Sequence, residues 1–226
     1  MDIEKHKDLQ RDATIEAKQH RWIASPARGV ERCILERRGG ETALRATSLV
    51  RFAPESYFPE HTHRLGEEFL VLDGVFSDET GDYPAGTYVR NPPSSSHAPH
   101  TKEGCTIFVK LEQFDENDAA RVVLGTHNKT LWKPEVDGVS QLPLHAFANE
   151  RIDLLAISKG CALPELAFDA GAEHFVVRGR VEIDGTSLGP RSWVRRAGKV
   201  AHTIVATEDS LLYRKAGHLP STLPTP

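Results

Sequence analysis

The sequence predicts an all-β protein made of two tandem copies of one module, the second copy degenerate. Two observations carry this prediction. The chain is a series of short segments rich in β-branched and aromatic residues, and it repeats itself at an offset of 105 residues. The composition, with 39% hydrophobic and 27% charged residues, is that of a folded globular chain and not of a disordered one.

The predicted strands come first. Turn-forming clusters of Gly, Pro, Asp and Ser separate them, which is typical of antiparallel β-structure. The clearest strands cover residues 46–53, 67–77, 86–92 and 105–111. Two further stretches are candidates for helices, namely the charged N-terminal arm and the short amphipathic run at 113–124, which Asp118 would cap.

The repeat at 105 residues sets the predicted domain organisation. We expect an N-terminal arm over residues 1–19, a first repeat over 20–118 and a second repeat over 119–226. The polar residues between Phe114 and Thr130 form the expected linker. Matched residues include Pro59 with Pro164, Glu68 with Glu173, Gly74 with Gly179, Arg90 with Arg195, His97 with His202, and Lys110 with Lys215.

Composition and charge exclude several classes of function. The net charge is -4 and the basic residues are scattered, so we expect no nucleic-acid partner. No apolar run approaches the 18 or so residues that span a bilayer, and the charged N-terminus lacks the apolar core of a signal peptide, so the prediction is a cytoplasmic protein without a membrane segment. Cys33, Cys105 and Cys161 form no C-x-x-C pair, which argues against disulfides and thiolate zinc sites and favours small buried residues.

The strongest functional signal is a set of metal ligands in the first repeat. His61 and His63 are two residues apart, so on a strand both imidazoles point to the same face. After a short turn, Glu67 begins the next strand and can fold back toward them, whereas Glu68 must face the opposite way. His97 follows a strand and turn marked by Gly86 and Pro92. Three imidazoles and one carboxylate suit a borderline divalent metal.

These residues resemble the two motifs of the cupin superfamily. His61, His63, Glu67 and Gly74 match the first motif, and Gly86, Pro92 and His97 match the second, with Ser94 where the family prefers glycine. The resemblance implies two jelly-roll barrels in tandem, a bicupin, with one divalent metal at the mouth of the N-terminal barrel.

A finer resemblance is to the cupin domain of ChrR-type anti-sigma factors. It lies in EEFLVLDGVFSDETGDYPAGTYVRNPPSSSH and GCTIFVKL and covers about residues 20–112. In that family the cupin binds zinc and receives a signal, while a separate N-terminal zinc domain grips the sigma factor. Before Trp22 this chain has His6 and His20 but no cysteine, so the resemblance implies a metal cupin more than sigma-factor binding.

The second repeat loses most of the predicted ligands. At the offset of 105, His61 becomes Leu166, His63 becomes Phe168 and Glu67 becomes Ala172, while His202 keeps the place of His97. We expect one metal per chain. His202 is expected to make a hydrogen bond within the core, and a small polar pocket formed by His174 and His202 is an alternative.

Two classes of function remain open at this point. In the first, zinc is held in a sensor module that contacts a regulatory protein, for which a sigma factor is a weak candidate. In the second, the metal is iron, manganese or nickel, and the protein is a non-haem dioxygenase that cleaves a β-diketone or phenolic ketone bound at the metal. No residue is assigned a catalytic role. Open sheet edges and the arm also predict a homo-oligomer.

Overall fold

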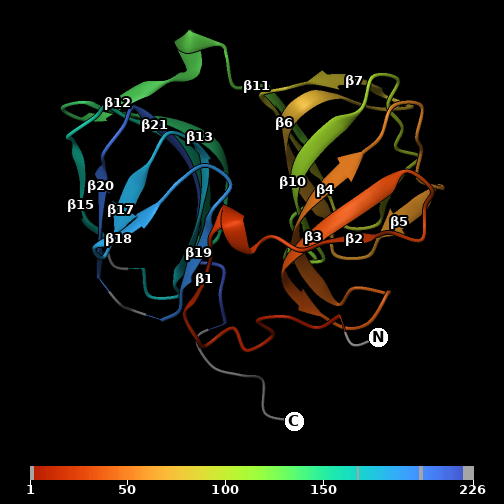
Figure 1. The fold of residues 1–226 in the computed structure, drawn as a ribbon, viewed down its shortest axis with the longest axis horizontal. Helices are drawn as coiled ribbons and strands as arrows, with labels where there is room; N and C mark the ends of the chain where they lie inside the picture. Colours follow the sequence, from red (N-terminus) through yellow and green to blue (C-terminus); the bar gives the residue numbers. More distant parts are fainter. Residues whose placement is uncertain (1–2, 167, 199–200, 221–226) are drawn as a thin grey trace. The chain divides into compact units, whose positions relative to one another are not determined.

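The computed structural model describes residues 3–166, 168–198 and 201–220, and it has an all-β fold (Figure 1). Within these ranges, helical structure consists of two three-residue 3-10 turns, Ala17–Gln19 and Lys129–Leu131. The two helices considered from the sequence were wrong. The arm carries strand β1 (Ala13–Ile15), and the stretch at 113–124 is loop and turn that leads into β11 (Val122–Gly125). No helix of the described residues is long and apolar enough to cross a membrane.

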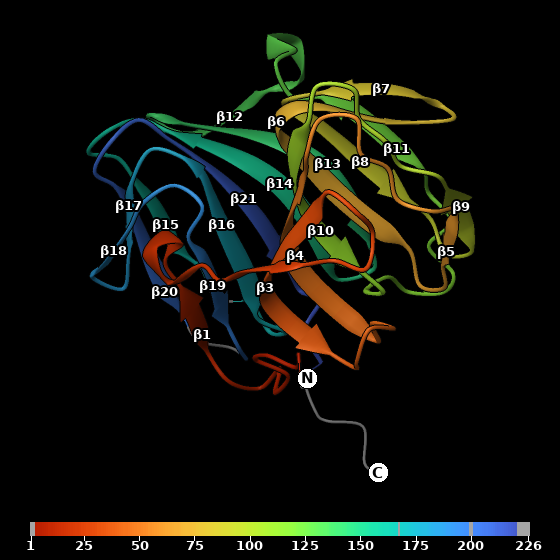
Figure 2. The ribbon, with the colours of Figure 1, turned by 45° about the vertical axis from the view of Figure 1, so that its right-hand side comes forward.

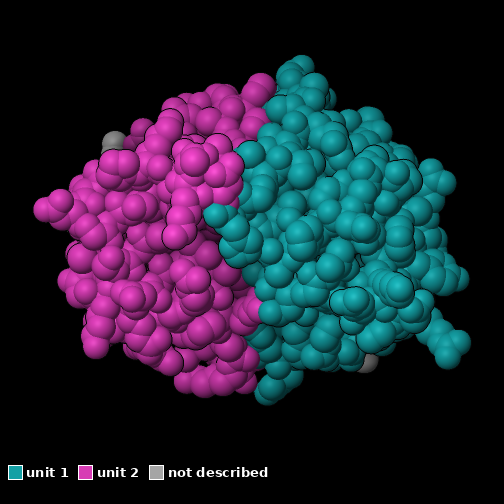
Figure 3. Space-filling view, turned by 90° about the horizontal axis from the view of Figure 1, so that it is seen from above, with its two compact units in different colours: residues 1–7, 20–127 teal, residues 8–19, 128–226 magenta. Residues whose placement is uncertain are grey.

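The chain divides into two compact units (Figure 3). Unit 1 comprises Met1–Lys7 with His20–His127, and unit 2 comprises Asp8–Gln19 with Asn128–Pro226. This division differs from the expected one within the arm and at the C-terminal end of the first repeat. Strand β11 lies beyond residue 118 but pairs with β8, and β1 lies in the arm but pairs with β19 of unit 2.

Unit 1 contains one large antiparallel sheet and a small two-stranded sheet. The large sheet has the order β11-β8-β6-β10-β4-β3-β2, with β7 paired to β6, and the small one is β5-β9. The strands are β2 (Trp22–Ala24), β3 (Val30–Arg38), β4 (Arg45–Phe52), β5 (His61–His63), β6 (Glu67–Asp78), β7 (Gly81–Pro84), β8 (Thr87–Asn91), β9 (Ser95–His97), β10 (Cys105–Leu111) and β11.

Unit 2 repeats this arrangement. Its large sheet has the order β1-β19-β16-β21-β14-β13-β12, and a second sheet has the order β15-β20-β17-β18. The strands are β12 (Lys133–Val136), β13 (Val139–Phe147), β14 (Glu150–Ile157), β15 (Ala162–Leu166), β16 (Ala172–Arg178), β17 (Val181–Ile183), β18 (Thr186–Leu188), β19 (Trp193–Arg196), β20 (His202–Ala206) and β21 (Ser210–Ala216).

The register of strand pairing confirms the repeat residue by residue. Glu68 pairs with Lys110 across β6 and β10, and Glu173 pairs with Lys215 across β16 and β21. Each residue of the second pair lies 105 positions after its counterpart, so the offset read from the sequence is also the offset between equivalent places in the two sheets.

The edge strands β11 and β1 occupy equivalent places in the two large sheets, but they do not follow the sequence repeat. β11 pairs Val122 with Arg90, and β1 pairs Ala13 with Arg195, so the two strands occupy equivalent places although one follows its module and the other precedes both modules. An N-terminal segment thus completes the C-terminal sheet.

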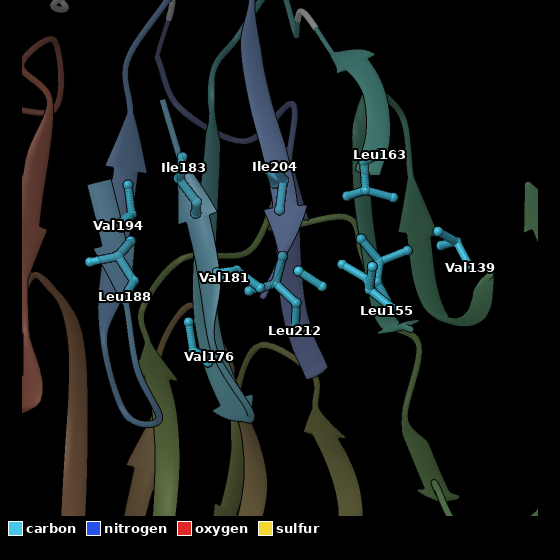
Figure 4. Close-up of a cluster of buried hydrophobic side chains, with 12 residues drawn as sticks. Val139, Leu155, Leu163, Val176, Val181, Ile183, Leu188, Val194, Ile204 and Leu212 are labelled. Atoms are coloured by element: carbon cyan, nitrogen blue, oxygen red, sulfur yellow. The ribbon is translucent and has the colours of Figure 1, made fainter. Parts of the chain in front are cut away.

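Each unit has its own apolar core. In unit 2, Leu155, Val176, Ile204 and Leu212 belong to a cluster of buried aliphatic side chains (Figure 4). In unit 1, aromatic residues take a larger part, as in the contact of Phe69 with Phe76, whose ring centroids are 4.5 Å apart.

All three cysteines are free. Cys33 and Cys105 are buried and Cys161 is partly buried. Burial raises the pKa of the Cys105 thiol to about 12, since the hydrogen bond with Thr101 only partly opposes it. Cys105 therefore behaves as a neutral core residue at neutral pH.

Candidate metal centre

Two short strands position the histidines. β5 and β9 lie side by side (Figure 2) and pair antiparallel. The pairing sets His61 opposite His97 and His63 opposite Ser95. His63 and His97 are buried, while Thr62, which lies between the two histidines of β5, faces solvent and contacts Ser96. The two-residue period of a strand therefore places the imidazoles on one face, as predicted.

The turn after His63 brings the chain back toward the three histidines. Gly66 has a φ of 75°, and a Cβ on it would lie 2.1 Å from the Phe114 ring, so only glycine fits this turn. Glu67 follows it as the first residue of β6 and is buried. Glu68 faces the other side, where the Tyr88 hydroxyl donates a hydrogen bond to its carboxylate over 2.6 Å, in agreement with the strand alternation.

The four predicted ligands converge. The donor nitrogens of His61, His63 and His97 all lie within 4.8 Å of one another. The Nε2 atoms of His63 and His97 are 3.1 Å apart, and Glu67 Oε2 lies 3.5 Å from the first and 3.4 Å from the second. Ligand atoms at about 2.1 Å from a tetrahedral or octahedral ion lie about 3.0–3.4 Å from each other, so these spacings fit a shared divalent metal.

Three further groups orient the ligands. The Asp78 carboxylate lies 3.4 Å from Nδ1 of His97, the Pro59 carbonyl lies 2.8 Å from Nδ1 of His61, and the Asn91 amide donates to Glu67 over 3.2 Å. Contacts of this kind fix the tautomer and orientation of metal-binding side chains. With Nδ1 so engaged, His61 and His97 present Nε2 to the centre.

Sequence reasoning missed Asp78 and Asn91. Asn91 lies directly opposite Glu67 in the pairing of β6 with β8, so a correct hairpin register would have found it. Asp78 could not be found in this way, because the pairing of β6 with β10 shifts register before Gly74 and breaks the alternation on which strand predictions depend.

Electrostatics of the centre favour a carboxylate anion among imidazoles. Burial opposes ionisation of Glu67, but the three histidines and the Asn91 amide together hold its pKa below the usual value. Burial lowers the pKa of His61. Burial also opposes the charging of His97, but Glu67 and Asp78 outweigh it and raise the pKa of His97, so a proton competes with a metal there.

A cavity of about 340 Å³ adjoins the centre within unit 1. His61, His63 and Glu67 contribute to its wall. Most of the remaining wall is apolar, and two arginines contribute to it as well. The wall also includes Arg32, Arg37, Glu41, Val50, Phe52, Phe76, Ile107, Val109 and Glu112.

The second unit has a different polar group at the equivalent place. His202 occupies the position of His97, but Phe168 and Ala172 replace two of the ligands; the side chain at Leu166 lies outside the described residues. His174 Nε2 lies 2.8 Å from His202 Nε2, and both residues are buried. Among the described residues of this unit no group of three metal-binding side chains occurs. The pair makes the hydrogen bond that we expected for His202.

The comparisons with known proteins support the same fold. Residues 10–115 match the family described as the ChrR Cupin-like domain. A candidate dioxygenase from Nostoc punctiforme superposes with a TM-score of 0.73 at 15% identity, covering 96% of this chain and 86% of the other. A bacterial pirin from Escherichia coli in complex with nickel(II) gives 0.72 at 14% identity, with 94% and 100% covered.

A third solved structure, a candidate glyoxylate-induced protein from Pseudomonas aeruginosa, gives a TM-score of 0.72 at 12% identity, covering 99% of this chain and 95% of the other. No curated protein matches the sequence. These likenesses show the fold, two barrels of the cupin fold in tandem. The family match covers a little under half of the chain, and that N-terminal part is similar to the cupin domain of ChrR.

Proposed function

We propose that this chain is a metal-binding bicupin that holds one divalent ion in its N-terminal barrel through His61, His63, Glu67 and His97. The observation that carries the proposal is the approach of three donor atoms, on His63, His97 and Glu67, to within 3.1–3.5 Å of one another. Without an ion, two buried imidazoles beside a buried carboxylate would gain little, since each loses its hydration. A bound divalent ion supplies Lewis acidity and a place for an oxygen ligand.

We further propose that the centre serves a sensor module that responds to a ligand or a reactive signal, with zinc as the favoured ion. The match of residues 10–115 to the ChrR Cupin-like domain supports this function. In such a module, loss or alteration of one ligand changes the surrounding strands and thereby a contact with a regulatory partner, for which a sigma factor is the candidate.

The alternative is a metal-dependent dioxygenase, and the cavity beside the centre favours it. A space of about 340 Å³ with a mostly apolar wall can hold a diketone or phenolic ketone, orient it and exclude water.

Metal analysis of freshly purified protein tests the metal site. We expect about one divalent ion per chain, and none after His61→Ala with His63→Ala. Two ions per chain, or an unchanged content in the double variant, would contradict the proposal.

The two classes of function then separate by activity and by binding. Dioxygen uptake by iron-loaded protein with a panel of β-diketones and phenolic ketones would favour the enzyme. No uptake, together with zinc in the isolated protein and saturable binding of a purified sigma factor, would favour the sensor module.

A further inference from the structure

The cavity of unit 1 has a charged region in addition to the metal centre. Arg32 on β3 and Glu41 on the following hairpin both contribute to its wall, and so does Arg37. The three residues lie close together. Arg32 Nη2 donates to the Glu41 carboxylate over 2.7 Å, and Arg37 Nη2 donates to the Glu41 backbone carbonyl over 2.7 Å.

Two guanidinium groups lie near one carboxylate at this place, and Arg32 donates to it. The hydrogen bonds described for the Arg37 side chain go to the carbonyl oxygens of Gly40 and Glu41, which carry no net charge. Arg37 is buried, and the Arg32 side chain is only 12% exposed. The cluster therefore carries one uncompensated positive charge with little access to water.

Arg32 also has an unused donor. Its Nε atom is buried and has no hydrogen-bond partner among the described residues. A buried charged donor without a partner is costly, and a carboxylate is the group that satisfies a guanidinium best, through two parallel hydrogen bonds.

The other carboxylates of the wall are already matched. Glu112 accepts a hydrogen bond from the Leu65 backbone and lies 3.6 Å from Arg64, and Glu67 belongs to the histidine centre. The surplus positive charge at Arg32 and Arg37 is thus not cancelled by these groups. The wall also has apolar side chains, among them Val50, Phe52 and Ile107.

We propose that the cavity binds an amphipathic organic acid, a ligand with an apolar body whose carboxylate is held by Arg32 and Arg37. Glu41, which is largely exposed at its carboxylate, acts as a stand-in anion that the ligand displaces from Arg32. An oxygen-bearing group of the same ligand faces the histidine centre. The contact at the histidine centre rests on the proposed metal function. The binding of the carboxylate rests on the arginine cluster alone.

The test compares the affinity for an acid with the affinity for its uncharged amide analogue. Binding of 4-phenylbutyrate and 4-phenylbutyramide to the metal-free full-length chain is measured by isothermal titration calorimetry. The two probes share the apolar body, so the ratio of their Kd values reports the charged contact. We expect the acid to bind about tenfold more tightly than the amide. Equal binding of the two, or tighter binding of the amide, would overturn the proposal.

Two variants should change the affinity for the acid in opposite directions. Arg32→Gln should weaken binding of the acid about tenfold and leave the amide unchanged, whereas Glu41→Gln should strengthen binding of the acid by removing its competitor. Arg51→Gln and Glu31→Gln are the matched controls, because these residues form a similar ion pair between β3 and β4 but do not line the cavity. A loss of acid binding in the controls as large as in Arg32→Gln would count against the assignment.

The same titration with His61→Ala and His63→Ala together separates this inference from the proposed metal site. The preference for the acid should persist in that variant. If the wild-type protein takes up no metal but still prefers the acid, the metal function fails and the anion site stands. If it binds metal but shows no preference for the acid, the anion site fails alone.

Discussion

The Nε2 atoms of His63 and His97 face each other at 3.1 Å, and the equivalent place in the second unit holds His202 facing His174 at 2.8 Å. The two contacts have similar geometry but different surroundings. In unit 1 the pair is joined by His61 and Glu67, whereas in unit 2 phenylalanine and alanine take the places of His63 and Glu67. The same backbone thus supports a proposed ligand set in one barrel and a hydrogen-bonded pair in the other.

His97→Ala and His202→Ala form a matched pair of variants at equivalent positions. Removing His97 takes away one of the proposed ligands, so the bound divalent metal should fall to background in elemental analysis after dialysis. Removing His202 should leave the metal content at one per chain. If folded His202→Ala protein lost its metal, a ligand would lie in unit 2. That result would contradict the proposed site in unit 1.

Asp78→Asn should weaken metal binding about 10- to 100-fold without removing a ligand, because the carboxylate orients His97 through Nδ1. Competition with a chromophoric chelator measures the affinity. Asp82→Asn is the control, since its carboxylate accepts a hydrogen bond from Ser77. Equal affinities for Asp78→Asn and wild type would remove Asp78 from the site.

The His174 and His202 pair should make the protein sensitive to acid. Burial, together with His202 and Arg214, holds the pKa of His174 well below its usual value, so the unfolded chain binds a proton below about pH 6.5 and the folded chain does not. Stability is therefore lost as the pH falls below about 6.5, by up to about 1.4 kcal/mol per pH unit.

His174→Phe introduces the residue found at the equivalent position 69. This variant should not show the loss of stability at low pH that His174 causes. Urea unfolding of metal-free wild type and variant from pH 7.5 to 5 gives the comparison. The free energy of unfolding of the wild type should fall more steeply than that of the variant below about pH 6.5. Parallel curves would show that His174 titrates alike in the folded and unfolded states.

Ser94→Gly should stabilise the protein. Ser94 has a φ of 66°, in the left-handed region where side chains are strained, and its backbone N–H donates to the His63 carbonyl over 2.7 Å. Glycine relieves the strain but costs entropy, so we expect a net gain of about 0.5–1 kcal/mol, seen as a higher Tm. A lower Tm with unchanged metal content would mean that the Ser94 side chain stabilises this turn.

The sequence alone was sufficient for the all-β class, the 105-residue repeat and the convergence of His61, His63 and Glu67. Each of these depends on local rules. Residues two apart on a strand share a face, and a glycine turn returns the chain, so His61, His63 and Glu67 meet whatever the rest of the sheet does. The repeat needed no structure either, because equivalent residues keep equal spacing.

Only the tertiary structure decided which distant segments complete the sheets and the site. Strand β1 joins β19 from a place 180 residues earlier in the chain, and Asp78 reaches His97 after a register shift that local alternation cannot follow. The contacts of Arg32 and Arg37 with Glu41, and the contact of His174 with His202, likewise depend on hairpin geometry and strand packing. Such contacts are long-range, and their energies depend on which groups are buried together, a property that spacing along the sequence does not contain.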